Sequence, residues 1–173
     1  MSFLRYALFT VPAVLMLGTL SGAISGSGEE NGWFAALAKP EAMPPGWAFG
    51  LVWPILYILL GLALAMVLHA RGARGRGLAV ALFLLQLILN YAWSPLFFAW
   101  HEVGAALWLI IAIIAITAVV ATLFWRIRRA AALLLVPYLA WLGFAAWLNA
   151  EIDRLNPEAE QLVPGEVSSD IAI

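Results

Sequence analysis

The segment from residue 86 to residue 100 holds the side chains best suited to receive a polar group inside a membrane. It places two carboxamides, those of Gln86 and Asn90, and the indole of Trp93 within a stretch that is otherwise rich in apolar residues. On a helix, spacings of three or four residues predict one shared face for Gln86, Asn90, Trp93, Phe97 and Trp100. Because a carboxamide in hydrocarbon costs free energy unless it meets a partner, a cavity or a ligand, we expect this face to point inward toward a binding site.

The elements that must position these side chains are membrane-spanning helices. Of the 173 residues, 65% are hydrophobic and 11% are charged, and the mean hydropathy of +0.97 is typical of a polytopic membrane protein. The predicted fold class is all-α, a five-transmembrane-helix bundle with spans at Phe3 to Ala23, Trp47 to Ala70, Leu78 to Trp100, Gly104 to Trp125 and Ala130 to Ala150. We assign residues 1–156 to this domain and residues 157–173 to a flexible acidic tail.

The first apolar segment also has features of a signal peptide, since Arg5 precedes it and small residues follow it. Its apolar run is longer than that of a typical signal peptide, which favours a first membrane span. Gly18 and Gly22 within it form a small-residue motif that lets helices approach closely.

The charged residues between the predicted spans sort by side of the membrane. Arginines precede the first span and follow the second and the fourth, whereas the first loop and the C-terminal segment are acidic. The positive-inside rule then predicts a cytoplasmic N-terminus and an external C-terminus. In a bacterial envelope this pattern favours the inner membrane.

Several kinds of chemistry lack their usual residues here. No Asp, Glu, Lys or Arg lies in the middle of a predicted span, which argues against proton-coupled carriers and charge-lined pores. Cysteine is absent, and the two histidines, His69 and His101, end spans on opposite sides of the membrane, too far apart to share one metal or one haem. We therefore predict no metal site, no required cofactor and no nucleic-acid partner.

The first connection, Ile24 to Gly46, is long enough to fold back over the bundle as a lid. A flexible Ser-Gly segment precedes the apolar turn from Trp33 to Leu37, and prolines stiffen the return to the second span. This turn is predicted either to dock on the mouth of a cavity or to lie as an amphipathic segment at the membrane interface.

Seven of the nine tryptophans divide into two groups by their depth in the spans. Trp47, Trp100, Trp125 and Trp108 lie near span ends, where an interfacial aromatic belt explains them. Trp53, Trp93 and Trp141 lie deeper. With Tyr57, Asn90, Tyr138 and Ala145 at helical spacings from them, these three residues describe an aromatic box suited to a flat, largely apolar ring system. The alternative is that the same side chains only pack helices together.

These residues also form ordered motifs along the chain. Trp33-Phe34 precedes Lys39-Pro40, and Pro44-Pro45-Gly46-Trp47 leads to Phe49, Trp53 and Tyr57. The set Gln86, Asn90, Trp93, Pro95, Phe97 and Phe98 follows, and then Pro137-Tyr138-Leu139-Ala140-Trp141 with Phe144, Ala145, Leu148 and Asn149. In this order and spacing the sequence resembles the TspO/MBR family, the tryptophan-rich sensory proteins and the mitochondrial translocator protein, also called the peripheral benzodiazepine receptor.

The resemblance implies a five-helix bundle, often a homodimer, with a ligand cavity capped by the first loop. It implies porphyrin or haem-related tetrapyrrole ligands, sterol-like ligands in some members, and isoquinoline or benzodiazepine-type ligands, and it admits an outer-membrane location. Residues from the resemblance and from the aromatic box together give a ligand-binding set of Phe34, Phe49, Trp53, Tyr57, Asn90, Trp93, Tyr138, Trp141 and Ala145. In this set Asn90 would donate to a ligand carbonyl or carboxylate, and the three tryptophans would stack on rings.

Two positions depart from the family pattern. Ala42 stands where the family commonly has a tryptophan between the Lys-Pro and Pro-Pro pairs, and Ala150 stands where the sterol-recognition stretch needs a tyrosine. Arg154 alone retains that stretch, so the resemblance gives sterol binding little support.

Three functions are compatible with the sequence. The first is a tetrapyrrole-binding sensor or transporter whose ligand passes under the first loop. The second is catalytic, a light- and oxygen-dependent porphyrin degradation at Trp53 or Trp141, as the resemblance suggests for some bacterial members. The third is an accessory helix bundle without a small-molecule ligand.

Overall fold

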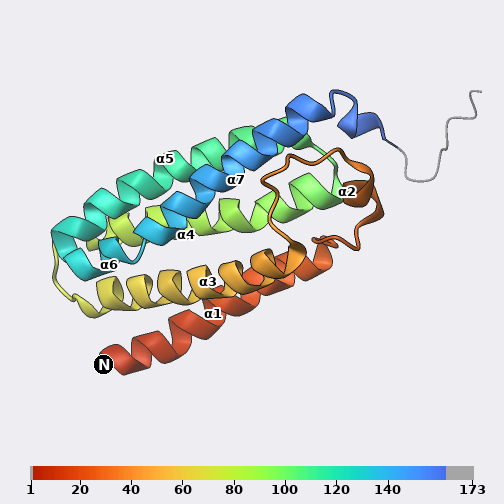
Figure 1. Ribbon diagram of the computed structural model, residues 1–173. Coiled ribbons are helices and arrows are strands. Elements are labelled where there is room, and N and C mark those ends of the chain that lie inside the picture. The colour runs from red at the N-terminus through yellow and green to blue at the C-terminus, as the bar shows by residue number, and fades with distance from the viewer. Residues whose placement is uncertain (1, 163–173) are drawn as a thin grey trace, which may run out of the picture.

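The structure, a computed structural model, describes residues 2–162, and all regular elements in that range are helical (Figure 1). Five segments are long and apolar enough to cross a membrane. They are α1 (Phe3–Ile24), α3 (Gly46–His69), α4 (Arg76–Ser94) continued by the π-helix η1 (Pro95–Ala99), α5 (Val103–Ile127), and α6 (Arg129–Leu133) continued by α7 (Val136–Leu155). The predicted all-α, five-span fold is confirmed.

The N-terminus and the end of α7 lie at opposite ends of the bundle, as an odd number of crossings requires (Figure 1). Helix α1 packs along α3, and α5 lies between α4 and α7. Helices α3 and α7 contact each other at few points. The short helix α2 (Gly32–Ala36) lies in the loop that crosses one end of the bundle, which we call the lid end (Figure 1).

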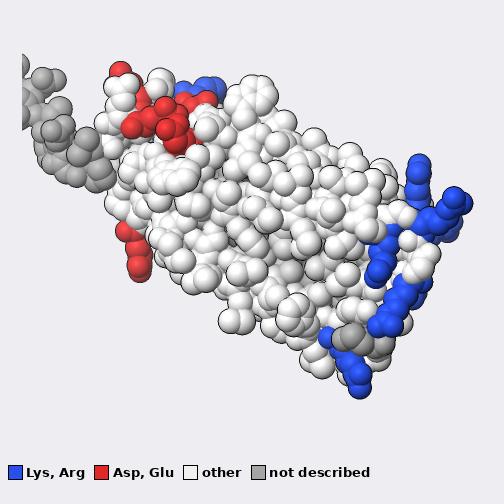
Figure 2. All heavy atoms as spheres, turned by 180° about the vertical axis from the view of Figure 1, so that it is seen from behind, with Lys and Arg blue, Asp and Glu red and all other residues white. Residues whose placement is uncertain are grey.

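Charged side chains separate to the two ends of the molecule, with an uncharged band between them (Figure 2). Lys and Arg gather at the end that carries the N-terminus, which we call the basic end, and Asp and Glu gather at the lid end. This separation agrees with the sorting of charges that the sequence predicts.

Small residues let α1 and α3 approach closely. A Cβ atom at Gly61 would lie 2.6 Å from the backbone of Val11, and one at Gly18 would overlap the ring of Tyr57. The hydroxyl of Thr10 donates across the interface to the carbonyl of Gly61 at 2.8 Å. The expected helix contact at Gly18 is therefore confirmed, and it lies within this chain.

A proline changes the register at the end of α4. Pro95 has no N–H to donate to the carbonyl of Tyr91, and the hydroxyl of Ser21 on α1 donates to that carbonyl instead. The chain continues as a π-helix, in which the Trp100 N–H donates to the Pro95 carbonyl at 3.0 Å. The wider turn corrects one prediction, since Trp100 is 68% exposed and leaves the inward face that Phe97 still shares.

The fifth span begins with a break. Pro137 cannot donate to the carbonyl of Leu133, and the chain turns between α6 and α7 instead of forming one continuous helix from Ala130. Helix α7 then runs to Leu155, about one turn beyond the predicted end at Ala150.

The first residues of the expected tail are folded. The 3₁₀ helix η2 (Ala159–Gln161) packs on the lid, Ala159 is 2% exposed, and its carbonyl accepts from the Trp33 indole N–H at 2.8 Å. This differs from the flexible tail expected from residue 157, because a buried indole needs an acceptor and finds it there. The remainder of that tail, residues 163–173, lies outside the described residues.

Candidate functional site

A cavity of about 410 Å³ lies inside the lid end of the bundle, between α1, α3, α4 and α7 and beneath the first loop. Its size falls within the range of small-molecule sites in proteins, roughly 300 to 1,000 Å³. Eight of the nine residues predicted to bind a ligand line it, namely Phe34, Phe49, Trp53, Tyr57, Asn90, Trp93, Trp141 and Ala145. The structure thus brings together side chains from the loop and from three helices.

Tyr138 is the exception, and its predicted place in the site is wrong. It is fully buried behind the cavity wall, where its hydroxyl donates to Gln86 Oε1 at 3.0 Å. The hydroxyl of Thr117 lies 3.5 Å from the same oxygen. A tyrosine in a membrane bundle needs a partner for its hydroxyl, and Gln86 supplies one in the core rather than in the cavity.

The two carboxamides of α4 therefore have different surroundings. Gln86 lies among Tyr138 and Thr117 and does not line the cavity. Asn90, one turn further along, lines the cavity, and its Oδ1 accepts from the Tyr57 hydroxyl at 3.3 Å. That acceptance leaves the Nδ2 amide group of Asn90 free to donate, with no hydrogen-bond acceptor among the described residues.

Two indole N–H groups in the cavity wall also lack acceptors. The Nε1 atoms of Trp93 and Trp141 are buried and without a partner in the described part of the chain. Aromatic contacts fix the rings themselves: Trp93 stacks on Phe97 with centroids 4.9 Å apart, and Trp141 meets Phe49 edge to face at 5.7 Å. A buried, unpaired N–H is unfavourable, so two of the residues that line the cavity each keep an unused donor.

Asn149 is a cavity residue that the sequence interpretation left out of the ligand-binding set. Its side chain is 2% exposed, its Nδ2 donates to the Val103 carbonyl at 2.9 Å, and its Oδ1 has no partner among the described residues. The spacing could have indicated it, because Asn149 follows Ala145 by four residues and Trp141 by eight, on the same face of α7. The Oδ1 atom of Asn149 thus adds an unpaired acceptor to a cavity lining whose other unpaired groups are N–H donors.

The first loop docks on the bundle as a lid. Asn31 caps α2 by accepting from the Phe34 N–H at 2.9 Å, which directs Trp33 and Phe34 inward. Both side chains are buried, and Trp33 stacks on His101 with centroids 4.3 Å apart. The turn thus packs against the bundle at the cavity, and Phe34 forms part of the cavity wall.

Hydrogen bonds tie the lid to the ends of neighbouring helices. The Asn156 side chain at the end of α7 accepts from the Ala38 N–H at 2.8 Å and donates to the Ala38 carbonyl at 2.9 Å. Glu29 Oε1 accepts from the Gly46 N–H at 2.8 Å, at the start of α3. With the bond from Trp33 to Ala159, these contacts hold the lid closed from both sides.

Lys39 brings a positive charge to the cavity wall beneath the lid. Its ammonium donates to the carbonyls of Phe34, Ala35 and Leu37 at 2.8, 3.3 and 3.3 Å and lies 4.7 Å from the centre of the Phe34 ring. Within residues 2–162 no carboxylate pairs with it, and no group of acidic and histidine side chains there could hold a metal ion. The site is thus aromatic, rich in donors and carries a cation at its edge.

The helices and the cavity define a five-span membrane protein with an internal aromatic chamber closed by its first loop. The sequence matches the model of the TspO/MBR family over residues 9–155, and the chain belongs to this family.

The chain is similar to bacterial and animal members of the family. It is 40% identical over 126 residues to the tryptophan-rich protein TspO of Chlorobaculum tepidum, covering 72% of this chain and 80% of that protein. It is 37% identical over 142 residues to the human translocator protein, covering 81% and 84%. Identity to the tryptophan-rich sensory protein of Cereibacter sphaeroides is 37% over 130 residues, covering 73% and 80%.

Proposed function

We propose that the cavity binds a porphyrin or haem-related tetrapyrrole and that the protein acts as a membrane sensor or transporter of this ligand. The observation that carries the proposal is the pair of buried, unpaired N–H groups of Trp93 and Trp141, set among aromatic faces. A flat ring with polar substituents at its rim would stack on the indoles and accept from these groups and from Asn90 Nδ2.

Charge also suits a tetrapyrrole. Its carboxylates would lie toward Lys39, whose ammonium has carbonyl oxygens as neighbours and no acidic partner in the described residues. The names of two relatives, translocator protein and tryptophan-rich sensory protein, fit transport and sensing respectively. We extend both roles to this chain as alternatives.

The proposed orientation follows the charges at the two ends. The basic end would face the cytoplasm and the lid end the opposite side, in the inner membrane of a bacterial envelope (Figure 2). Ligand bound under the lid would then lie within the outer half of the bilayer.

A second candidate function is light-dependent degradation of bound porphyrin by oxygen. The observation that favours it is the presence of two indoles, Trp53 and Trp141, on the wall of one cavity, where each would contact an excited ring. Porphyrin and oxygen are the co-reactants, and the protein's own contribution would be an oxidisable indole held against the ring.

Equilibrium binding of protoporphyrin IX to the purified protein in detergent tests the proposed function. Trp141→Phe keeps a ring and removes the N–H, and Asn90→Ala removes the donor amide, so each should weaken binding about tenfold, the effect of one hydrogen bond of about 1.4 kcal/mol. The matched control is Trp125→Phe, on the half-exposed surface of α5, which should bind like the parent chain. Binding is read from quenching of tryptophan fluorescence.

Equal losses in all three variants, or no saturable quenching by the parent chain, would overturn the proposed site. Illuminating the same samples addresses the second candidate, since a porphyrin absorption spectrum that changes no faster than that of free porphyrin removes the degrading activity.

A further inference from the structure

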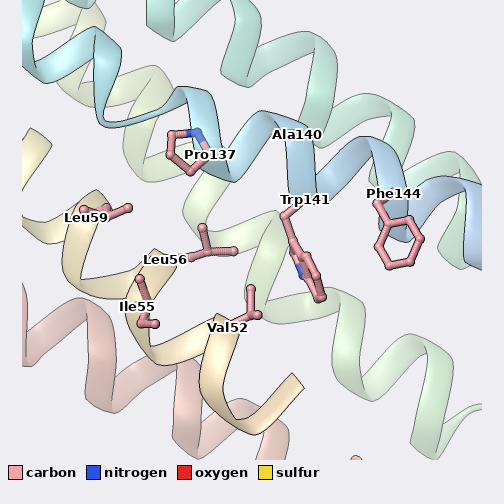
Figure 3. A pocket seen from close by; sticks show the side chains of 8 residues that line it. All are labelled: Val52, Ile55, Leu56, Leu59, Pro137, Ala140, Trp141 and Phe144. Atoms are coloured by element: carbon pink, nitrogen blue, oxygen red, sulfur yellow. The ribbon is translucent and has the colours of Figure 1, made fainter. Parts of the chain in front are cut away.

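A groove of about 560 Å³ lies between α3 and α7, on the outside of the bundle beside the cavity (Figure 3). Val52, Leu56 and Leu59 line it from α3, and Pro137, Ala140 and Phe144 line it from α7. These side chains are apolar, both helices are membrane spans, and the two helices contact each other at few points. The groove is therefore a depression in the part of the surface that meets hydrocarbon.

Trp141 lines both the groove and the cavity. Its side chain extends from α7 toward Val52 of α3, next to Phe144 (Figure 3). One indole therefore separates the cavity from the membrane at this point.

Apolar and aromatic contacts, without a hydrogen bond from the indole, hold Trp141 within the described part of the chain. Its Nε1 atom makes no hydrogen bond within the described residues, and its ring contacts are with Phe49 at 5.7 Å and Phe144 at 5.6 Å between centroids. Its neighbours Ala140 and Ala145 are small. A change of side-chain rotamer would thus break no hydrogen bond and would give up only apolar and aromatic contacts.

The route through the lid has much stronger obstacles. Five hydrogen bonds hold the lid down, from Trp33 to Ala159, between Asn156 and Ala38 in both directions, from Gly46 to Glu29, and from Asn31 to the Phe98 carbonyl. Lifting the lid would also expose Trp33 and Phe34, which are 2% and 8% exposed. Opening a protein there costs polar and apolar contacts together.

We propose that the ligand of the cavity passes sideways between the cavity and the membrane hydrocarbon, through the groove between α3 and α7, with Trp141 as the movable partition. The identity of that ligand rests on the proposed function, and the route does not. An apolar groove admits an uncharged ring edge and disfavours a charged group, so the route suits ligands dissolved in the bilayer. Trp141 then has two roles, closing the route and donating to the bound ligand.

Thiol labelling tests the route without any porphyrin. The parent chain has no cysteine, so Ala145→Cys places a single thiol in the cavity wall and outside the groove. The probe is N-phenylmaleimide, which dissolves in bilayers, added to the protein in phosphatidylcholine vesicles. The measured quantity is the rate at which this thiol is labelled, followed by mass spectrometry.

Filling the groove is the decisive change. Ala140→Phe, added to the Ala145→Cys variant, puts a ring into the groove and should slow labelling about tenfold, which corresponds to a barrier about 1.4 kcal/mol higher. The matched control is Val136→Phe, one turn earlier on α7, 55% exposed and outside the groove, and it should leave the rate unchanged. Unfolding would expose the thiol and speed labelling, so a slower rate cannot come from a misfolded variant.

A third variant distinguishes the route through the lid. Asn156→Ala removes two of the five hydrogen bonds of the lid and should leave the labelling rate unchanged. Labelling that Ala140→Phe does not slow, or that Asn156→Ala accelerates, would overturn the lateral route in favour of passage under the lid. Because no porphyrin is present, these outcomes are independent of the binding test for the proposed function.

Discussion

Aromatic side chains occur at both ends of this bundle, but they fill the core at the basic end and line a cavity at the lid end. At the basic end, Phe83 of α4 and Phe124 of α5 stack 5.6 Å apart and are fully buried, with Leu60, Val67 and Leu135 closing the space around them. At the lid end, rings line a cavity of about 410 Å³. Aromatic residues alone therefore do not create a binding site. Whether a cavity remains between them depends on how far apart the helices lie.

The separation has local causes. Near the basic end, the short helix α6 adds a further layer of small, buried side chains, Ala131 and Ala132, against the core. Near the lid end, α4 widens into the π-helix after Pro95, and the closing layer is a loop instead of a helix. Gln86 and Asn90 lie one turn apart on either side of this boundary, one inside a solid core and one on a cavity wall.

The largest expected effect comes from making the same truncation at both ends. Phe83→Ala removes a fully buried ring from the solid end and should lower the free energy of unfolding by about 3 to 5 kcal/mol, because the space left cannot collapse. Phe49→Ala enlarges a space that already exists and should cost less than about 1.5 kcal/mol. Thermal unfolding in one detergent measures both, and equal losses would mean that the lid end is as solid as the other.

The next largest effect is expected from a substitution at Gly18, which lies beside Tyr57 in the wall of the cavity. Gly18→Ala would force a methyl group into the Tyr57 ring and should lower the free energy of unfolding by about 1 to 3 kcal/mol. It should also weaken porphyrin binding, because Tyr57 holds Asn90 through their hydrogen bond.

Gly22→Ala, one turn along the same helix, is the matched control for this substitution. Its Cβ would lie 3.7 Å from Ser27 Oγ, an ordinary contact, so the variant should be neutral or gain up to about 1 kcal/mol from helix propensity. A Gly18→Ala protein as stable as the Gly22→Ala protein would show that Tyr57 moves aside without cost.

These contrasts also mark how far the sequence could predict the molecule. Hydropathy predicts the five spans because the bilayer fixes their length and their composition. Helical spacing together with the family resemblance predicts the cavity wall, since Trp53, Asn90 and Trp141 each lie at helical spacings from other residues that line it. Both inferences assume regular helical geometry.

Predictions failed where that geometry or the choice of partner departs from the regular case. Trp100 leaves its predicted face because the π-helix inserts a wider turn, and Tyr138 leaves the site because Gln86 offers its hydroxyl an acceptor in the core. The hydrogen bond from the Trp33 indole to the Ala159 carbonyl joins residues 126 positions apart, and no local sequence pattern predicts such a pairing. The last two depend on which distant group supplies a hydrogen bond, whereas the first depends on the change of helix type that begins at Pro95.

The smallest effect separates the two carboxamides on either side of the boundary. Gln86→Leu leaves the Tyr138 hydroxyl without an acceptor but also removes the unpaired Nε2 atom of Gln86, so the free energy of unfolding should fall by about 1 kcal/mol while porphyrin affinity is unchanged. Asn90→Leu should reduce affinity about tenfold, and because it leaves the Tyr57 hydroxyl without its acceptor it should also lower the free energy of unfolding by about 1 kcal/mol. Fluorescence quenching therefore distinguishes the two variants, and thermal unfolding checks the cost of each lost acceptor. If Gln86→Leu reduced affinity as much as Asn90→Leu, the polar cluster around Gln86 would belong to the ligand site and the boundary between the two ends would lie one turn deeper.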